Sequence, residues 1–403
     1  MRRSSDGFHS MKVVLSTIGK FHTFDLARQM HQRGALTAIF SGYPWFKLKN
    51  EGLPKGKVKT FPYLHAPYMR FATRSVAARQ FWEWQDKVWF DWYMARNLPS
   101  CDVFCGLSGS ATHSSRVAKS RGAIHVCDRA SSHIRFQDRI LREEYDRQGI
   151  SFSGIDPRAI AREESEYESA DIITVPSTFV FNSFTELGVP NKKLRLVPYG
   201  VDLSAFHPCA PKNDNEFHVL FVGGVSVRKG VSYLVDAFQQ LQHKKKTLTL
   251  AGTISPEMET AVRQWRHNSQ ISVLGHVPQP RLKEIMSMSH VMVLPSVEEG
   301  LAYVQGQAMA CGCPVVATEH TGARDLFTDG KEGFIVPIRN PNAIAKRLQS
   351  LADSPDTRMS MSEAALQRVQ SMGGWEQYGE RMYRIFSELI ARDYPVVLSE
   401  IAS

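Results

Sequence analysis

Short apolar runs alternate with longer amphipathic stretches from the start of the chain. An apolar run at residues 11–16 is followed by an amphipathic stretch at 23–33, which ends at Gly34, and by a second apolar run at 36–40. Strand-length runs separated by helix-length stretches are typical of βαβ units. The alternation continues through further predicted strands at 103–106, 123–127, 172–175, 194–198 and 217–222. The pattern predicts an α/β protein built on parallel sheets.

The chain of 403 residues is long for a single hydrophobic core, so two domains are expected. The segment Pro198-Tyr199-Gly200-Val201-Asp202 and the proline-containing stretch after it interrupt the pattern, which places the hinge near 200–215. We therefore expect a first domain at 1–200 and a second domain at 201–374. The amphipathic stretch 375–391 predicts one more helix.

One segment between residues 291 and 318 combines a strand, a loop, a helix and a second strand. Its loop, Glu298-Glu299-Gly300-Leu301-Ala302-Tyr303, leads into a helix whose first turn offers backbone N–H groups without partners in the helix. Upstream, the apolar run 217–222 ends in Gly223-Gly224 and is followed by Arg228-Lys229-Gly230. A helix start and two cations suit a bound diphosphate. The second half is therefore predicted to bind a phosphate-bearing ligand.

The order and spacing of these motifs resemble family 4 of the glycosyltransferases, retaining enzymes with the architecture called GT-B. The matching pieces are the glycine turn with Arg228-Lys229-Gly230, the Pro-Ser-x-x-Glu-Gly segment at 295–300, the helix and strand at 308–318, and the stretch from Thr321-Gly322 to 329–337. The resemblance covers most of the second half. It implies two Rossmann-like, doubly wound domains facing across a cleft, with the C-terminal helix, within 375–403, packing back on the first domain.

The resemblance implies that the second domain binds a nucleoside-diphosphate sugar, the donor. Glu299 is expected to contact the donor sugar and to stabilise the positive charge of the transition state, whereas Glu298 is expected to lie in solvent. The other implied donor contacts are Gly223, Gly224, Arg228, Lys229, Gly252, Val277, Gly300, Leu301, Ala302, Tyr303 and Gln307. Gly224 stands where the family usually has an arginine, and Gln307 where it has a second glutamate. A glutamine carbonyl still accepts hydrogen bonds from a ribose diol, at a cost of about 1 kcal/mol.

Polar residues gather at the carboxyl end of the predicted strand 123–127, the edge at which doubly wound sheets bind ligands. Asp128 and His133 are the candidates for steadying the acceptor hydroxyl as it loses its proton. Capping of the following helix by Asp128 or Ser131 is an equally valid interpretation. The remaining predicted acceptor contacts are Gly19, Lys20, His22, Arg129 and Ser131.

Neither a metal nor another cofactor is expected. The sequence holds no Asp-x-Asp motif, which leaves Arg228, Lys229 and the helix start at Tyr303 to neutralise the leaving diphosphate. The cysteines show no metal-ligand spacing and are expected to be reduced thiols. They are Cys101, Cys105, Cys127, Cys209, Cys311 and Cys313.

The net charge and the hydropathy of the chain indicate which kinds of partner it can bind. The chain has 49 Lys and Arg against 40 Asp and Glu, a formal charge of +9, which favours acidic partners such as nucleotide sugars or anionic membranes. Nucleic acid is not expected, because no binding motif for it is present. No apolar run is long enough to span a bilayer, and residues 1–10 are polar. A cytoplasmic protein is predicted, with peripheral contact at the inner face of the membrane as an option.

Aromatic residues and cations mix in the predicted helix 75–96, which has four tryptophans between residues 82 and 92. Such a helix can rest on a membrane interface or grip a lipid-linked acceptor. Packing in the core of the first domain is the favoured interpretation, because apolar residues occupy more than one face and the acids Glu83, Asp86 and Asp91 dilute the basic charge.

These features predict a retaining, metal-independent glycosyltransferase that moves a sugar from a nucleoside-diphosphate sugar to a hydroxyl of a glycan or lipid-linked acceptor, in polysaccharide or glycoconjugate synthesis. Two alternatives stay open. A non-catalytic nucleotide-sugar-binding scaffold or sensor in a polysaccharide assembly complex agrees with Gly224 and Gln307, whereas the presence of Arg228, Lys229 and Glu299 argues against it. A disaccharide phosphorylase-like enzyme on the same fold would keep the second-domain features.

Overall fold

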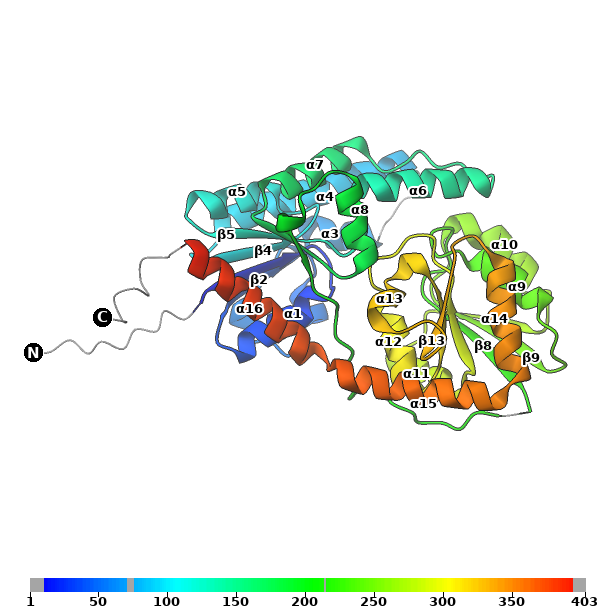
Figure 1. Ribbon diagram of the computed structural model, residues 1–403. Helices are drawn as coiled ribbons and strands as arrows, with labels where there is room; N and C mark the ends of the chain where they lie inside the picture. The colour runs from blue at the N-terminus through cyan, green and yellow to red at the C-terminus, as the bar shows by residue number, and fades with distance from the viewer. Residues whose placement is uncertain (1–10, 71–75, 214, 394–403) are drawn as a thin grey trace, which may run out of the picture.

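The computed structural model describes residues 11–70, 76–213 and 215–393, which form two α/β domains lying side by side (Figure 1). In the described part of the first domain, seven parallel strands form a sheet in the order β3-β2-β1-β4-β5-β6-β7. The strands are β1 (Val13–Thr17), β2 (Leu36–Ser41), β3 (Val58–Thr60), β4 (Val103–Leu107), β5 (Ile124–Asp128), β6 (Ile172–Val175) and β7 (Leu194–Leu196). Its helices are α1 (Thr23–Gln32), α2 (Trp45–Leu48), α3 (Pro62–Arg70), α4 (Val76–Asn97), α5 (Thr112–Ser120), α6 (Ile134–Arg147), α7 (Pro157–Ser169) and α8 (Thr178–Glu186).

The second domain repeats this plan with six parallel strands among the described residues, in the order β10-β9-β8-β11-β12-β13. The strands are β8 (Phe217–Val222), β9 (Lys246–Ala251), β10 (Ile271–Gly275), β11 (Val291–Leu294), β12 (Val315–Thr318) and β13 (Gly333–Val336). Its helices are α9 (Val231–Gln240), α10 (Glu259–Trp265), α11 (Gln279–Met288), α12 (Tyr303–Ala310), α13 (Ala323–Leu326), α14 (Pro341–Asp353) and α15 (Pro355–Met372). The predicted fold class, two Rossmann-like domains with parallel sheets, is confirmed.

The strand order fixes where a ligand can bind. In the first sheet β1 lies between β2 and β4, and in the second β8 lies between β9 and β11. At such a switch point the two following loops leave in opposite directions and open a crevice at the carboxyl ends of the strands. In the second domain, these two loops are the ones that carry Arg228-Lys229 and Glu298-Glu299.

The last helix joins the second domain to the first. Figure 1 shows α15 continuing into α16 (Trp375–Asp393), which crosses to the first domain and packs against α1. The contact is close, since a Cβ on Gly379 would lie 2.4 Å from Cβ of Gln29. Tyr378, Met382 and Phe386 of α16 are buried, and burial of a large apolar side chain contributes about 1.5–3 kcal/mol. The residues after 393 lie outside the described part of the chain.

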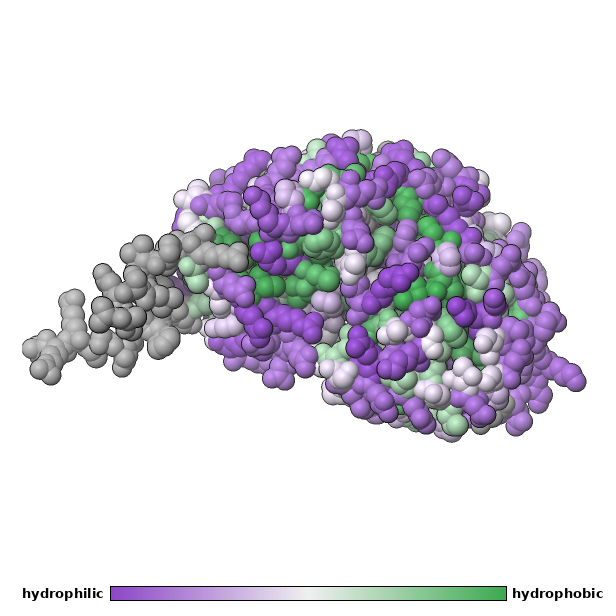
Figure 2. Space-filling model, in the orientation of Figure 1, coloured by the Kyte–Doolittle hydropathy of each residue, from purple (hydrophilic) through white to green (hydrophobic). Residues whose placement is uncertain are grey.

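The central strands are buried on both faces, as expected of sheets covered by helices on each side. Every residue of β11 and β12 is buried, and so is every residue of β1. Figure 2 shows the converse, a surface that is mostly hydrophilic, with hydrophobic residues showing in the middle of the first domain and near the second.

The tryptophan-rich helix α4 has two unlike faces. Phe90 and the acids Asp86 and Asp91 are buried; Asp86 pairs with His65 of α3 at 2.7 Å, and Asp91 accepts backbone N–H bonds at the start of α5. The opposite face exposes Phe81 (48%), Trp82 (47%), Trp89 (46%) and Trp92 (41%). The expectation of a core helix is therefore wrong for this face. Asp86 and Asp91 face inward, so they do not dilute the charge of the aromatic surface, whereas the Glu83 side chain is 47% exposed and pairs with Lys87. Residue 75 lies outside the described residues.

Candidate functional site

Two glycine turns form the floor of the second-domain crevice. Gly223 ends β8 and Gly252 ends β9, with φ of +145° and +155°, values that side chains other than glycine rarely adopt. A Cβ on Gly252 would lie 1.7 Å from the carbonyl oxygen of Gly223. Gly224 differs, since a Cβ there would meet only the carbonyl and hydroxyl oxygens of Thr253, both at 3.9 Å. Gly223 and Gly252 must therefore be glycine, whereas Gly224 leaves room for a side chain.

Two cations and two carboxylates meet beside this turn. Arg228 donates from Nε to Glu298 at 2.8 Å and from a terminal nitrogen to Glu299 at 3.4 Å. Lys229 forms a salt bridge with the other oxygen of Glu299. The structure thus brings the predicted residues Arg228, Lys229 and Glu299 together. Ser131 of the first domain lies in the same cluster, with its hydroxyl 3.5 Å from Arg228.

Glu298 is the buried acid of the pair, so the expectation that it would lie in solvent is wrong. Its side chain exposes no surface. It accepts hydrogen bonds from the hydroxyl and backbone N–H of Ser132 at 2.7 and 3.1 Å, and from the amide of Gln137 at 2.9 Å. Burial acts to raise its pKa, but the Arg228 guanidinium and these donors lower it to about 2. Glu298 is therefore a charged link between the two domains.

The surroundings of Lys229 favour its uncharged form. Burial and the adjacent Arg228 lower the pKa of Lys229 to about 7, and the carboxylate of Glu298 opposes that change. An ordinary lysine keeps its charge to about pH 10. The positive charge that Lys229 offers to an incoming diphosphate therefore changes within the physiological pH range.

The helix start after Glu299 has no side-chain cap. The residue before α12 is Ala302, which offers no side-chain acceptor to the first-turn N–H groups. Leu301 and Ala302 are buried. Gly300 touches the first domain, because a Cβ there would lie 1.7 Å from the carbonyl oxygen of Ala130. The loop is held against the first domain while the helix start remains open to an anion.

A cavity of about 500 Å³ lies between the domains next to this helix start. The predicted donor residues Val277, Tyr303 and Gln307 line it together with Lys20 of the first domain. Lys20 forms a salt bridge with Glu51, also in the lining. The volume lies within the range of about 300–1,000 Å³ that suits a small-molecule ligand. Ser41 donates a hydrogen bond to the carbonyl of Gly19, which fixes the turn before Lys20.

His22 and Asp128 form a buried pair below the cleft. His22 Nε2 lies 2.5 Å from one oxygen of Asp128, and the hydroxyl of Thr174 donates to the other at 2.8 Å. The His22 ring lies 4.4 Å from that of Tyr199, which lies 5.0 Å from that of Tyr303. A series of ring contacts through Tyr199 therefore connects this pair with Tyr303, which lines the interdomain cavity.

Arg129 and His133 support the loop from within the first domain. Arg129 is buried and donates to Glu163 at 2.5 Å and to the carbonyl oxygen of Ser132 at 2.8 Å. His133 caps α6 by accepting from the N–H of Arg135. Burial, reinforced by the charge of Arg129, lowers the pKa of His133 to about 4, so it stays neutral. Helix α6 is therefore capped by His133, and not by Asp128 or Ser131.

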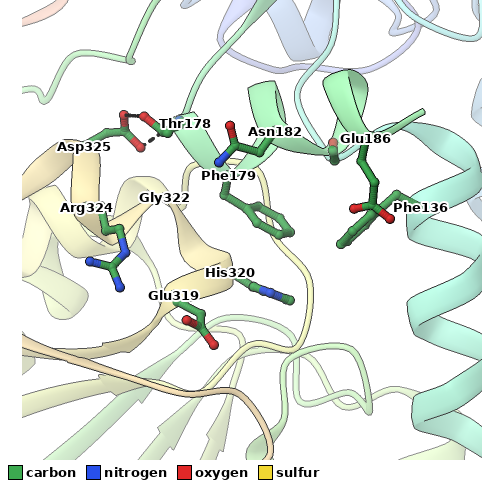
Figure 3. Close-up of a pocket in the computed structure, with 11 residues that line it drawn as sticks. Phe136, Thr178, Phe179, Asn182, Glu186, Glu319, His320, Gly322, Arg324 and Asp325 are labelled. Atoms are coloured by element: carbon green, nitrogen blue, oxygen red, sulfur yellow. Dashed lines mark hydrogen bonds between the residues drawn. The ribbon is translucent and has the colours of Figure 1, made fainter. Parts of the chain in front are cut away.

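A further cavity, of about 290 Å³, lies between α6 and α8 of the first domain and residues 319–325 of the second (Figure 3). Figure 3 shows Phe179 beside His320, with the rings stacked 4.4 Å apart. Thr178 of α8 binds Asp325 of α13 through its hydroxyl at 2.6 Å. His320 also contacts the carbonyl oxygen of Val297, next to Glu298, at 2.8 Å. The contacts of His320 and Asp325 therefore help to hold the Glu298-Glu299 loop in place at the domain interface.

No group of three or more His, Cys, Asp or Glu side chains is placed to hold a metal ion in the part of the chain that the structure describes. All six cysteines are free thiols. Among the same residues, no helix combines the length and the apolar character needed to cross a membrane.

Sequence patterns missed the role of Glu298 and its first-domain partners. Ser132 and Gln137 were not singled out, and Gln137 lies in the first turns of a helix where a polar residue is ordinary. The one available signal was the adjacency of two acids in a loop that otherwise matched a motif. Which of the two turns inward depends on Ser132 and Gln137, which are far away in sequence.

The second half of the chain is similar in sequence to known proteins. Residues 205–368 match the family described as Glycosyl transferases group 1. The D-inositol 3-phosphate glycosyltransferase of Pseudarthrobacter chlorophenolicus is 29% identical over 245 residues, which cover 56% of this chain and 58% of that protein. The chain thus spans less than two thirds of the length of that curated relative.

Solved structures agree over nearly the whole chain. Sucrose-phosphate synthase from Thermosynechococcus elongatus matches 95% of this chain and all of its own, with a TM-score of 0.70 and 19% identity. Anabaena HepE in complex with UDP matches 94% of this chain and all of its own, with a TM-score of 0.70 and 17% identity. These matches confirm the GT-B architecture, and the family match confirms the predicted resemblance of the second domain.

The burial of Glu298 predicts a large effect on stability. Glu298→Ala would leave Arg228 without its nearest carboxylate and the donors of Ser132 and Gln137 unsatisfied, so we expect about 3 kcal/mol of destabilisation. Urea unfolding should show a lower midpoint. The control is Glu143→Ala, which removes an exposed carboxylate 3.3 Å from Arg339 and should change little. Equal midpoints for both variants would contradict the role assigned to Glu298.

Proposed function

We propose, from the match of residues 205–368 to the glycosyl transferases group 1 family, that the protein transfers a sugar from a nucleoside-diphosphate sugar to a hydroxyl of a glycan or lipid-linked acceptor. The observation that carries the proposal is the meeting of Arg228, Lys229 and Glu299 beside the uncapped start of α12. A diphosphate needs such a combination of fixed cations and backbone N–H groups.

The donor occupies the interdomain cavity. Its base lies toward Val277, its ribose toward Gln307, and its diphosphate between Lys229 and the start of α12. Support comes from the cavity lining, which already joins Val277, Tyr303 and Gln307. Anabaena HepE was solved with UDP, so UDP is the first nucleotide to test.

In the transfer step, the bond between the anomeric carbon and the diphosphate oxygen breaks. The acceptor oxygen forms the new bond to that carbon, and its proton passes to the leaving phosphate. Arg228, Lys229 and the helix start stabilise the growing negative charge, while Glu299 faces the sugar and its developing positive charge. Retention of the anomeric configuration is what the family resemblance implies. The charge on these cations makes a metal ion unnecessary for the step.

The carboxylates contact the same cations that a diphosphate would bind. Glu299 contacts both Arg228 and Lys229. Donor binding therefore exchanges a carboxylate for phosphate oxygens at the same nitrogens, and it frees Glu299 to turn toward the sugar. Closure of the domains around the donor excludes water, which limits hydrolysis.

A lipid-linked acceptor would bring the protein to a membrane surface. The exposed face of α4 carries Phe81, Trp82, Trp89 and Trp92, and the Arg96 guanidinium lies 4.1 Å from the Trp92 ring. Aromatic rings with a neighbouring cation suit the headgroup region of an anionic bilayer. We include peripheral binding at the cytoplasmic face of the membrane in the proposal on this ground.

A non-catalytic scaffold is the second candidate. It is favoured by Gly224 and Gln307, which lack the charges the family usually has at these positions. A protein that binds a nucleoside-diphosphate sugar but neither transfers nor slowly hydrolyses it would support the scaffold.

Donor binding should depend on Lys229 and on pH. In EDTA, UDP at about 100 times its dissociation constant should stabilise the protein by about 2.7 kcal/mol, and Lys229→Ala should remove most of the effect. Because Lys229 loses its proton above pH 7, the UDP affinity measured by calorimetry should fall about tenfold between pH 7 and 8.5. Lys229→Arg keeps its charge and should bind equally across this range, which also controls for titration of the nucleotide. A wild-type affinity that does not change with pH would contradict the role of Lys229.

The space at Gly224 allows a gain of function. Gly224→Arg would add the cation that the family usually has, and a charge-assisted bond to the diphosphate should tighten UDP binding about tenfold. Gly224→Gln has a side chain of comparable length without charge, and should leave the affinity nearly unchanged. If both variants bind UDP alike, the turn does not face the diphosphate.

Removing the aromatic surface should release the protein from membranes. We expect the triple variant Trp82→Ser, Trp89→Ser and Trp92→Ser to lose at least fivefold in cosedimentation with vesicles of one part phosphatidylglycerol to three parts phosphatidylcholine. Met359→Ser, which changes a methionine that is 61% exposed on α15, should bind like the wild type. Thermal unfolding checks that the variants fold. Unchanged sedimentation of the triple variant would exclude α4 as the membrane surface.

A further inference from the structure

A second large cavity, of about 560 Å³, lies between α4, α6 and α7. Its walls come from the first domain except for Arg228 of the second. Trp84 and Phe152 give it an apolar side, and Gln80 and Gln137 a polar one. The volume suits a sugar or a short saccharide. This cavity is separate from the interdomain cavity that holds Tyr303 and Gln307.

Two residues in the wall of the second cavity contact the Glu298-Glu299 pair. Arg228, in its wall, contacts Glu299 at 3.4 Å, and Gln137, also in its wall, donates to Glu298 at 2.9 Å. The cation cluster therefore reaches the second cavity through Arg228, whereas the interdomain cavity is lined by Tyr303, at the helix start that follows the Glu298-Glu299 loop. A molecule in the second cavity would approach the donor sugar from the first-domain side of this loop.

The acidic side chains in the wall of the second cavity have ion-pair partners, whereas one of its cations has none among the residues that the structure describes. Each lining acid already has a cationic partner: Glu83 pairs with Lys87 at 2.9 Å, Asp156 with Arg158 at 2.6 Å, and Glu163 with Arg129 at 2.5 Å. Arg79 is different. It makes no ion pair or side-chain hydrogen bond with any residue in the described part of the chain, and neither does Gln80. The cavity thus holds one unmatched cation and an unused amide.

The ring of Trp84 is held in place at the cavity wall. It is half-buried, and the Arg158 guanidinium lies 5.0 Å from its centroid. An indole held in this way offers a flat apolar surface to the C–H groups of a pyranose ring, while neighbouring amides bind its hydroxyls. The guanidinium of Arg79 binds carboxylate or phosphate oxygens through two parallel hydrogen bonds.

We propose that this cavity is the acceptor subsite, and that it takes a sugar carrying one anionic group, a carboxylate or a phosphate, bound by Arg79 while Trp84 packs against the ring. The inference rests on the proposed transferase function and gives it an acceptor class. Gly19, Lys20 and His22 then belong to the donor side of the cleft, since Lys20 lines the interdomain cavity.

The test measures binding of three sugars to the UDP-saturated full-length protein. The probes are methyl glucoside, glucuronate and glucose 6-phosphate, titrated by calorimetry or followed by saturation-transfer NMR. At least one anionic probe should bind tenfold or more tightly than methyl glucoside. The stronger of the two distinguishes a carboxylate from a phosphate group on the acceptor.

Variants locate the site. Arg79→Ala should weaken the anionic probe about tenfold and leave methyl glucoside unchanged, and Arg79→Lys should recover part of the loss. Trp84→Leu should weaken all three probes, whereas Trp84→Phe keeps a ring and should lose less. Arg263→Ala, which removes an exposed cation on α10 of the second domain, is the matched control and should have no effect. Thermal unfolding confirms that each variant folds.

The outcomes separate the two proposals. Anionic probes that bind no better than methyl glucoside, or that ignore both Arg79→Ala and Trp84→Leu, would overturn the acceptor subsite while UDP binding persists. UDP affinity, measured first and without sugar, should be the same in Arg79→Ala as in the wild type. Failure of the wild-type protein to bind any nucleoside diphosphate would overturn the proposed function, and the acceptor assignment with it.

Discussion

The buried charge of Glu298 is the constraint on which the site depends. A carboxylate with no exposed surface is tolerated only when its oxygens are fully engaged, and here one partner, Arg228, comes from the second domain and two, Ser132 and Gln137, from the first. Satisfying this charge holds the domains together at the point where substrates meet. It also fixes the next residue, Glu299, in position beside the cations. A loop that would otherwise be mobile becomes a rigid part of the interface.

A second carboxylate shows the same arrangement farther from the reaction. Glu144 of α6 is buried and accepts from the hydroxyl of Tyr233 at 2.7 Å and from Arg339 at 2.6 Å, both in the second domain. Arg339 has a φ of +59°, which costs a non-glycine residue about 1 kcal/mol or more. The two carboxylates hold α6 against the second domain at both of its ends. Helix α6 therefore fixes the position of the first domain relative to the second.

Local sequence patterns were sufficient to predict the fold, but they did not predict the contacts at the domain interface. The predicted strands lie within a residue or two of β1, β2, β4, β5, β6, β7 and β8, because an apolar run between helical stretches is a property of neighbouring residues. The expectation that Glu298 lies in solvent was wrong, because its burial is decided by Ser132 and Gln137 across the domain interface. The core interpretation of helix α4 holds for the face that carries Phe90 and Met94 but not for the face that carries Trp82, Trp89 and Trp92, for a related reason. Its acids Asp86 and Asp91 find partners on α3 and α5, which composition alone does not reveal.

The packing of the Glu298-Glu299 loop against the first domain limits how the cleft can open. Gly300 lies against the carbonyl oxygen of Ala130 so closely that a single added carbon would overlap it. The loop therefore has no room to move toward the first domain, and the interface opens at this point only if the domains separate. Separation breaks the bonds of Glu298 to Ser132 and Gln137 and exposes its charge to water, which offsets part of the cost. Opening of the cleft is thus coupled to the same carboxylate that joins the two domains when the cleft is closed.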